Sequence, residues 1–101
     1  MSLYPGTEAE YERRHAPITR ELADTLSALG VRNYSIFLHP ATGQLFAYAE
    51  IESEERWNAI AATPACRQWW NYMRDLMPTE RDGRPRAVDL REVFHLPDLS
   101  P

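Results

Sequence analysis

The chain has 101 residues, of which 44% are apolar and 26% charged, and its formal net charge is −4. This composition is typical of a single globular domain over residues 1–101, and the acidic balance argues against a nucleic-acid-binding protein, which usually carries a basic patch. All 11 basic residues are arginines, which excludes a Schiff base on a lysine amine and protein-bound pyridoxal phosphate.

The lone cysteine and the lack of long apolar runs indicate the compartment. Cys66 has no partner for an intramolecular disulfide or for a CxxC redox or zinc pair. The N-terminal segment lacks the apolar core of a signal peptide, and no stretch approaches the roughly 20 apolar residues that span a bilayer. We therefore expect a cytoplasmic protein without membrane association.

The N-terminal third predicts a short strand followed by a long helix. Met1–Tyr4 would end a strand, and Pro5-Gly6 would form a turn. Thr7 is the expected N-cap of the helix, Pro17 is expected to kink it, and Gly30 is expected to end it. Apolar and aromatic side chains recur every three or four residues and form one stripe: Tyr11, His15, Ile18, Leu22, Leu26 and Leu29.

The middle of the chain predicts a β-hairpin. Residues 31–40 and 44–52 have strand character, and the PATG sequence between them is turn chemistry. Alternate residues of the first strand share one face: Tyr34, Ile36 and Leu38. The residues between them share the other face: Asn33, Ser35 and Phe37.

Two helices and a last strand complete the pattern. Ser53 is expected to cap a short helix, and Thr63 a second helix that starts with a proline. The second helix has a broad apolar side: Cys66, Trp69, Trp70, Met73 and Met77. Adjacent helical positions point about 100° apart, so we expect Trp69 and Trp70 to differ, with Trp70 the more buried. Alternating apolar residues over 87–96 predict the last strand.

This order of elements is that of a ferredoxin-like, split βαβ fold of the α+β class, with an antiparallel sheet and helices on one face. The opposite face would expose Phe37 and its neighbours, and an apolar face of this kind on a small protein suggests a partner. Two such sheets packed face to face would form a dimeric α+β barrel, so we expect a homodimer.

Tyr11 and His15 are the strongest candidates for chemistry. They lie one helical turn apart on one face. Either they are core packing, as helical stripes usually are, or they mark the point where the core opens. Together with tryptophans they suit a neutral monosaccharide, whose C–H faces lie on indole while its hydroxyls need hydrogen bonds. The three histidines lack metal-binding spacing and no Gly-rich phosphate loop is present, so we expect no metal and no cofactor.

The chain resembles the L-rhamnose mutarotase family nearly from end to end. The resemblance rests on five segments: EYERRHAPI (10–18), NYSIFL (33–38), LFAYAEIESEERWNAIA (45–61), CRQWWNYMRDLMP (66–78) and LREVFHLP (90–97). It implies a dimeric α+β barrel that interconverts the α and β anomers of L-rhamnose. It also implies that His15 is the proton donor, and it implies four sugar-binding residues: Tyr11, Tyr34, Trp69 and Trp70.

The chain departs from the family pattern at two places. Only Met1–Tyr4 precede the first turn, where a longer strand is usual, so either the chain is truncated or it starts at an internal Met. The sequence ITREL (18–22) stands where IWPEL is expected. Losing that aromatic residue and that proline would alter the helix kink or one wall of the pocket.

The implied reaction opens the hemiacetal ring and closes it on the other face of C1. One proton must reach the ring oxygen while another leaves the anomeric hydroxyl. His15 suits the role of acid, and Tyr11 or a bound water is the candidate proton acceptor. Two other functions are compatible with the expected fold, which alone does not separate them: a cofactor-independent oxygenase and a non-catalytic sugar-binding dimer.

Overall fold

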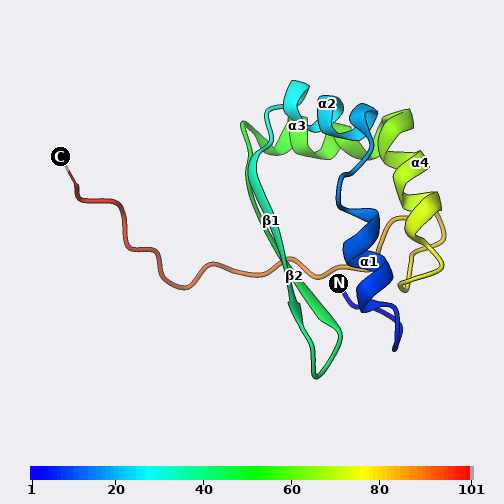
Figure 1. Cartoon of the computed structure of the whole chain (residues 1–101). Coiled ribbons are helices and arrows are strands. Elements are labelled where there is room, and N and C mark those ends of the chain that lie inside the picture. The colour runs from blue at the N-terminus through cyan, green and yellow to red at the C-terminus, as the bar shows by residue number, and fades with distance from the viewer. Residues whose placement is uncertain (101) are drawn as a thin grey trace.

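An antiparallel β-hairpin forms the centre of the structure, which is a computed structural model describing residues 1–100 (Figure 1). Strand β1 (Arg32–His39) pairs with β2 (Gln44–Glu50), and Phe37 faces Phe46 across the register. The helical elements follow in chain order: α1 (Glu8–Arg14), α2 (Arg20–Ala28), α3 (Glu54–Ala59), the 3₁₀ turn η1 (Ile60–Ala62) and α4 (Pro64–Met73). The α+β class is thus confirmed, with two paired strands among the described residues.

The expected first strand is reduced to a single bridge. Ser2 pairs with Gln44, the Leu3 amide donates to the Gly43 carbonyl at 2.8 Å, and the Leu45 amide donates to the Met1 carbonyl at 2.8 Å. These contacts place Met1–Leu3 along the outer edge of β2 and bring Leu3 into the core.

The expected single kinked helix is wrong, because the chain breaks into α1 and α2. Pro17 has no amide hydrogen and cannot continue a helix, and residues 15–19 form an irregular link. Thr19 then restarts the helix, since its side chain accepts a hydrogen bond from the Leu22 amide. The departure from the family pattern at ITREL therefore supplies an N-cap.

The other predicted caps have different outcomes. Ser53 and Thr63 are confirmed, because their hydroxyls accept the amides of Arg56 and Cys66 at 3.1 and 3.3 Å. Thr7 is the N-cap residue of α1, as predicted, but its side chain does not cap the helix. Its hydroxyl lies 2.7 Å from the Tyr4 carbonyl and donates to it, so it makes no cap hydrogen bond to α1.

Two apolar clusters join the helices to one face of the hairpin. The first consists of Leu3, Leu45, Met73, Leu76 and Met77, with Tyr11, Ile36 and Trp69 packed against it. The second consists of Val31, Ile60 and Cys66, with Leu26, Leu29 and Trp70 packed against it. The opposite face of the hairpin stays open, as predicted for Phe37, which is 61% exposed.

The last strand expected over residues 87–96 is wrong. After the bridge between Thr79 and Pro85, the chain leaves the body as an extended tail without strand pairing (Figure 1). Its apolar side chains are exposed: Val88, Leu90, Val93, Phe94 and Leu96. A strand without a neighbour gains no inter-strand hydrogen bonds. On the β2 side of the hairpin, Met1–Leu3 forms only a single bridge, which leaves little backbone for a further strand to pair with.

None of the helices within residues 1–100 combines the length and the apolar character needed to cross a membrane.

Gly30 ends α2 in a Schellman motif, in which the Val31 amide donates to the Leu26 carbonyl and the Gly30 amide to the Ser27 carbonyl. Its φ is +83°, and an added Cβ would lie 2.6 Å from the Glu52 side chain. Gly6 has the same φ but open space around it.

We expect Gly6→Ala to cost about 1 kcal/mol from backbone strain, and Gly30→Ala about 2–4 kcal/mol because a steric clash is added. Urea unfolding of both variants measures the difference. Equal losses would show that Glu52 moves aside freely.

Candidate functional site

Three aromatic side chains meet where α1 lies against α4. The rings of Tyr11 and His15 are 4.3 Å apart between centroids, and the His15 ring meets Trp69 edge-on at 5.0 Å. Tyr11 comes from the middle of α1, His15 is its C-cap residue and Trp69 comes from α4. The structure therefore joins the predicted helical pair to one of the two predicted tryptophans.

The hydrogen bond of His15 fixes which ring nitrogen is free. Its Nδ1 lies 2.7 Å from the Tyr11 carbonyl oxygen. A carbonyl oxygen only accepts, so Nδ1 carries a proton in the neutral and in the charged ring alike. Nε2 is then the nitrogen that takes or gives a proton at the site.

Tyr34 lies close enough to Tyr11 to influence its ionisation. Burial, with a smaller contribution from the neighbouring Tyr34, raises the pKa of Tyr11 to about 12. Burial also raises the pKa of Tyr34, with a smaller effect from Cys66. Both phenols therefore remain protonated at neutral pH and act as hydrogen-bond donors or acceptors, not as charged bases.

Trp70 lies apart from these residues. It packs with Val31 and Cys66 in the second core cluster. The guanidinium groups of Arg67 and Arg84 lie 5.5 and 5.7 Å from the centre of its ring. Both tryptophans are partly buried, so what separates them is their neighbours: His15 for Trp69, and two arginines for Trp70.

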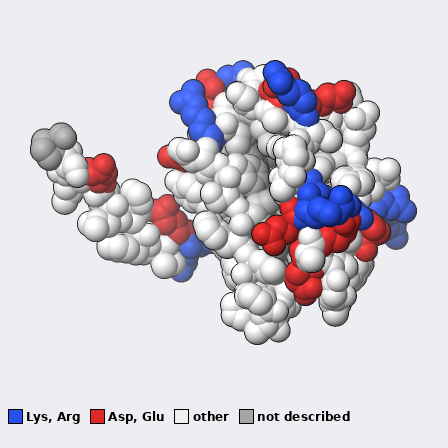
Figure 2. All heavy atoms as spheres, in the orientation of Figure 1, with Lys and Arg blue, Asp and Glu red and all other residues white. Residues whose placement is uncertain are grey.

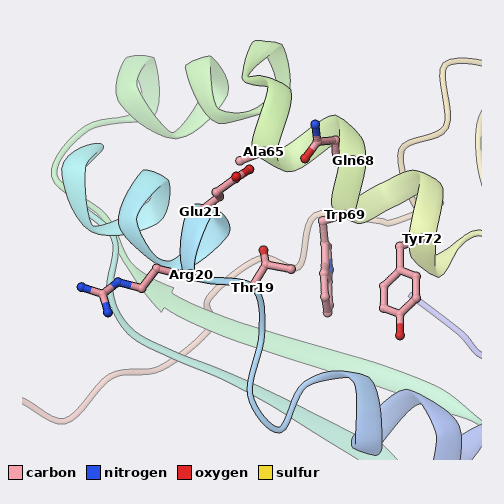
Figure 3. A pocket seen from close by; sticks show the side chains of 7 residues that line it. All are labelled: Thr19, Arg20, Glu21, Ala65, Gln68, Trp69 and Tyr72. Carbon is pink, nitrogen blue, oxygen red and sulfur yellow. The ribbon is translucent and has the colours of Figure 1, made fainter.

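A hollow of about 360 Å³ lies beside Trp69, between the start of α2 and α4 (Figure 3). Its lining residues are Thr19, Arg20, Glu21, Ala65, Gln68, Trp69 and Tyr72. Small-molecule sites commonly measure roughly 300–1,000 Å³. Figure 3 shows Trp69 and Tyr72 projecting the same way from α4, with Thr19 opposite Trp69.

Of the predicted site residues, only Trp69 lines this hollow. Sequence reasoning missed Thr19, Gln68 and Tyr72. The spacing of Gln68 and Tyr72 by one helical turn was the available signal for the last two.

Metal ligands and the thiol of Cys66 are the other possible sources of chemistry. Among residues 1–100, no three histidine, cysteine or acidic side chains are grouped so as to hold a metal ion. Burial raises the pKa of the Cys66 thiol to about 11, which keeps it protonated and makes it a poor nucleophile at neutral pH.

The chain is similar over nearly its whole length to known proteins. Residues 1–96 match the sequence profile of L-rhamnose mutarotase. A protein named L-rhamnose mutarotase from Opitutus terrae is 64% identical over 96 residues, covering 95% of this chain and 92% of that protein. One of the same name from Escherichia coli O8 is 52% identical over 97 residues, covering 96% and 93%.

A solved structure is similar as well. The crystal structure of an L-rhamnose mutarotase from Formosa agariphila matches with a TM-score of 0.85 and 32% identity, over 95% of this chain and 92% of that one. The sequence match and the shared fold both extend over nearly the whole chain, and on these grounds it belongs to the L-rhamnose mutarotase family.

Proposed function

We propose that this protein interconverts the α and β anomers of L-rhamnose, and that His15 is its acid–base residue. The observation that carries the proposal is the free Nε2 of His15 beside Tyr11 and Trp69, in a chain that belongs to this family. The relatives at 64% and 52% identity bear the same name, which favours this function over an oxygenase or a non-catalytic sugar-binding dimer.

Ring opening needs two coordinated proton transfers. The His15 imidazolium gives its Nε2 proton to the ring oxygen as the C1–O5 bond breaks. The proton of the anomeric hydroxyl leaves to a bound water, since Tyr11 with its raised pKa is a hydrogen-bond donor at neutral pH and not a base. Rotation about C1–C2 turns the other face of the aldehyde toward O5, and the same transfers in reverse close the ring.

The site contains groups for both sides of a 6-deoxy sugar. We place the sugar beside Trp69, whose indole suits the C–H face and the C5 methyl group. Tyr11 and Tyr34 have hydroxyls for hydrogen bonds to the sugar, and Thr19 and Gln68 provide polar groups in the adjoining hollow. The family resemblance implies that Trp70 also binds the sugar, while its contacts in this structure are with the second core cluster.

We also propose a homodimer whose interface covers the open face of the hairpin. On that face Phe37 and Phe46 lie directly opposite each other, and Tyr48 is 58% exposed. The apolar side chains of the tail over 88–96 would be covered in the same assembly. Apolar surface of this extent is unusual on a monomer.

We further propose a cytoplasmic location. The buried thiol of Cys66 is free and needs no oxidising compartment, which supports this proposal.

His15→Ala should abolish anomer exchange, because the proton donor is lost while the fold and the assembly remain. Saturation transfer between the two anomeric protons of L-rhamnose measures the exchange. His39→Ala is the matched control, since His39 lies exposed at the end of β1 and should retain full activity. Near wild-type exchange in His15→Ala would remove His15 from the mechanism.

Trp69→Phe and Trp70→Phe should differ in kind. Trp69→Phe should mainly weaken L-rhamnose binding, because the ring next to His15 loses area and its N–H. Trp70→Phe should mainly lower stability, by about 1–3 kcal/mol from underpacking. Titration calorimetry and urea unfolding of each variant separate the two effects. Unchanged affinity together with equal loss of stability would mean that both tryptophans are core packing.

Light scattering at micromolar concentration should give about twice the chain mass of 11.7 kDa. Phe37→Asp should shift the protein toward the monomer, because a carboxylate would be buried in the interface. Tyr4→Asp, at an exposed aromatic residue before the first turn, should not. A wild-type mass of one chain would reject the dimer.

A further inference from the structure

Two adjacent arginines of α1 differ in how far their side chains are exposed. The Arg13 side chain is 69% exposed and bonds Glu10, while the Arg14 side chain is only 12% exposed. Figure 2 shows acidic and basic side chains gathered over the region of α1. Arg13 and Arg14 carry the same charge, so Arg13 serves as the solvent-exposed control for the largely buried Arg14.

The Arg14 guanidinium joins α1 to the C-terminal end of α4. Its Nη1 donates to the Tyr72 carbonyl at 2.7 Å and to Asp75 Oδ1 at 2.8 Å, and its Nη2 donates to Asp75 Oδ2 at 3.2 Å. Its Nε donates to Glu10 at 3.2 Å, within α1. Carbonyls in the last turn of a helix lack intrahelical donors and attract cations, so this helix end suits a guanidinium.

The same arginine connects to the candidate site through a series of contacts between aromatic rings. Its Cζ lies 4.5 Å from the centre of the Tyr72 ring, and the Tyr72 ring lies 5.8 Å from Trp69. Trp69 in turn meets His15, the residue that follows Arg14. A continuous set of contacts therefore links the two helices, and it runs through Arg14, Tyr72, Trp69 and His15.

The short length of α1 gives this set of contacts its importance. A helix of seven residues is not stable by itself, so contacts with the rest of the protein must set its position. The carboxylate of Asp75 responds to the contact, since the Arg14 guanidinium holds its pKa below the usual range.

We propose that Arg14 is a positioning residue for the proposed mutarotase reaction: it fixes the last turn of α1 against α4, so that the His15 ring is held edge-on to Trp69. Arg14 acts through the placement of His15 and of Tyr11 in the same turn. The proposal rests on the function proposed above only for its effect on rate.

The test compares Arg14→Gln with Arg13→Gln in the full chain. The first readout is the Hε1 chemical shift of His15, which the rings of Tyr11 and Trp69 displace from the free-histidine value. His39 and His95 are internal references in the same spectrum. We expect Arg14→Gln to move the His15 resonance toward the free value and Arg13→Gln to leave it in place.

The second readout is anomer exchange of L-rhamnose. Arg14→Gln should lower kcat by about tenfold to a hundredfold, because small displacements of a catalytic group have effects of that order. Arg13→Gln should stay within about twofold. Arg14→Lys should recover part of the rate, since an ammonium reaches the same acceptors without the bidentate geometry.

Asp75→Asn keeps the proposal testable if Arg14→Gln fails to fold, since Asp75 is 63% exposed and contributes to neither apolar cluster. It should displace the His15 resonance in the same direction. An unchanged His15 shift in folded Arg14→Gln or, failing that, in Asp75→Asn would overturn the proposal, even if the urea midpoint falls. Absence of exchange in the wild type would refute the proposed function instead, and the His15 resonance would still test Arg14.

Discussion

The packing of Met73 is the contact on which the rest of the structure depends. Its side chain is 2% exposed and lies among Leu3, Leu45 and Leu76. This contact sets α4 on one face of the hairpin, because Leu45 belongs to β2. Trp69 lies one helical turn before Met73, so the same packing determines where its ring projects. The packing of the buried methionine in the apolar core thereby determines the position of a proposed sugar-binding side chain.

The position of α1 follows from that of α4. With seven residues, α1 gains little from its own hydrogen bonds. Tyr11 packs against the Met73 cluster, and Arg14 reaches the Tyr72 carbonyl and Asp75. One apolar and one charged contact therefore fix the turn that ends in His15. The proposed reaction needs one ring nitrogen of His15 at a defined place, and these two contacts hold it there.

Local chemistry predicted what depends on neighbours in sequence. The Ser53 and Thr63 caps, the hairpin and the Tyr11–His15 pair follow from spacing and residue type. Long-range partners were beyond that reasoning. The 87–96 segment alternates like a strand but pairs with no strand among the described residues. Arg14 differs from Arg13 through its bonds to the Tyr72 carbonyl and to Asp75, 58 and 61 residues away. The sequence correctly predicted that Pro17 disturbs the helix. It did not predict that Thr19 caps a new helix, so that the chain forms two helices and not one kinked helix.

The most direct test of this account locates the sugar. The indole N–H resonances of Trp57, Trp69 and Trp70 are followed in ¹H–¹⁵N spectra while L-rhamnose is titrated into the wild-type protein. Because we place the sugar beside Trp69, the Trp69 resonance should shift most. The Trp57 resonance should shift less, since the ring of Trp57 lies against Tyr34 and not against His15. A saturable shift largest at Trp57, or no indole shift at sugar concentrations that support anomer exchange, would contradict the account.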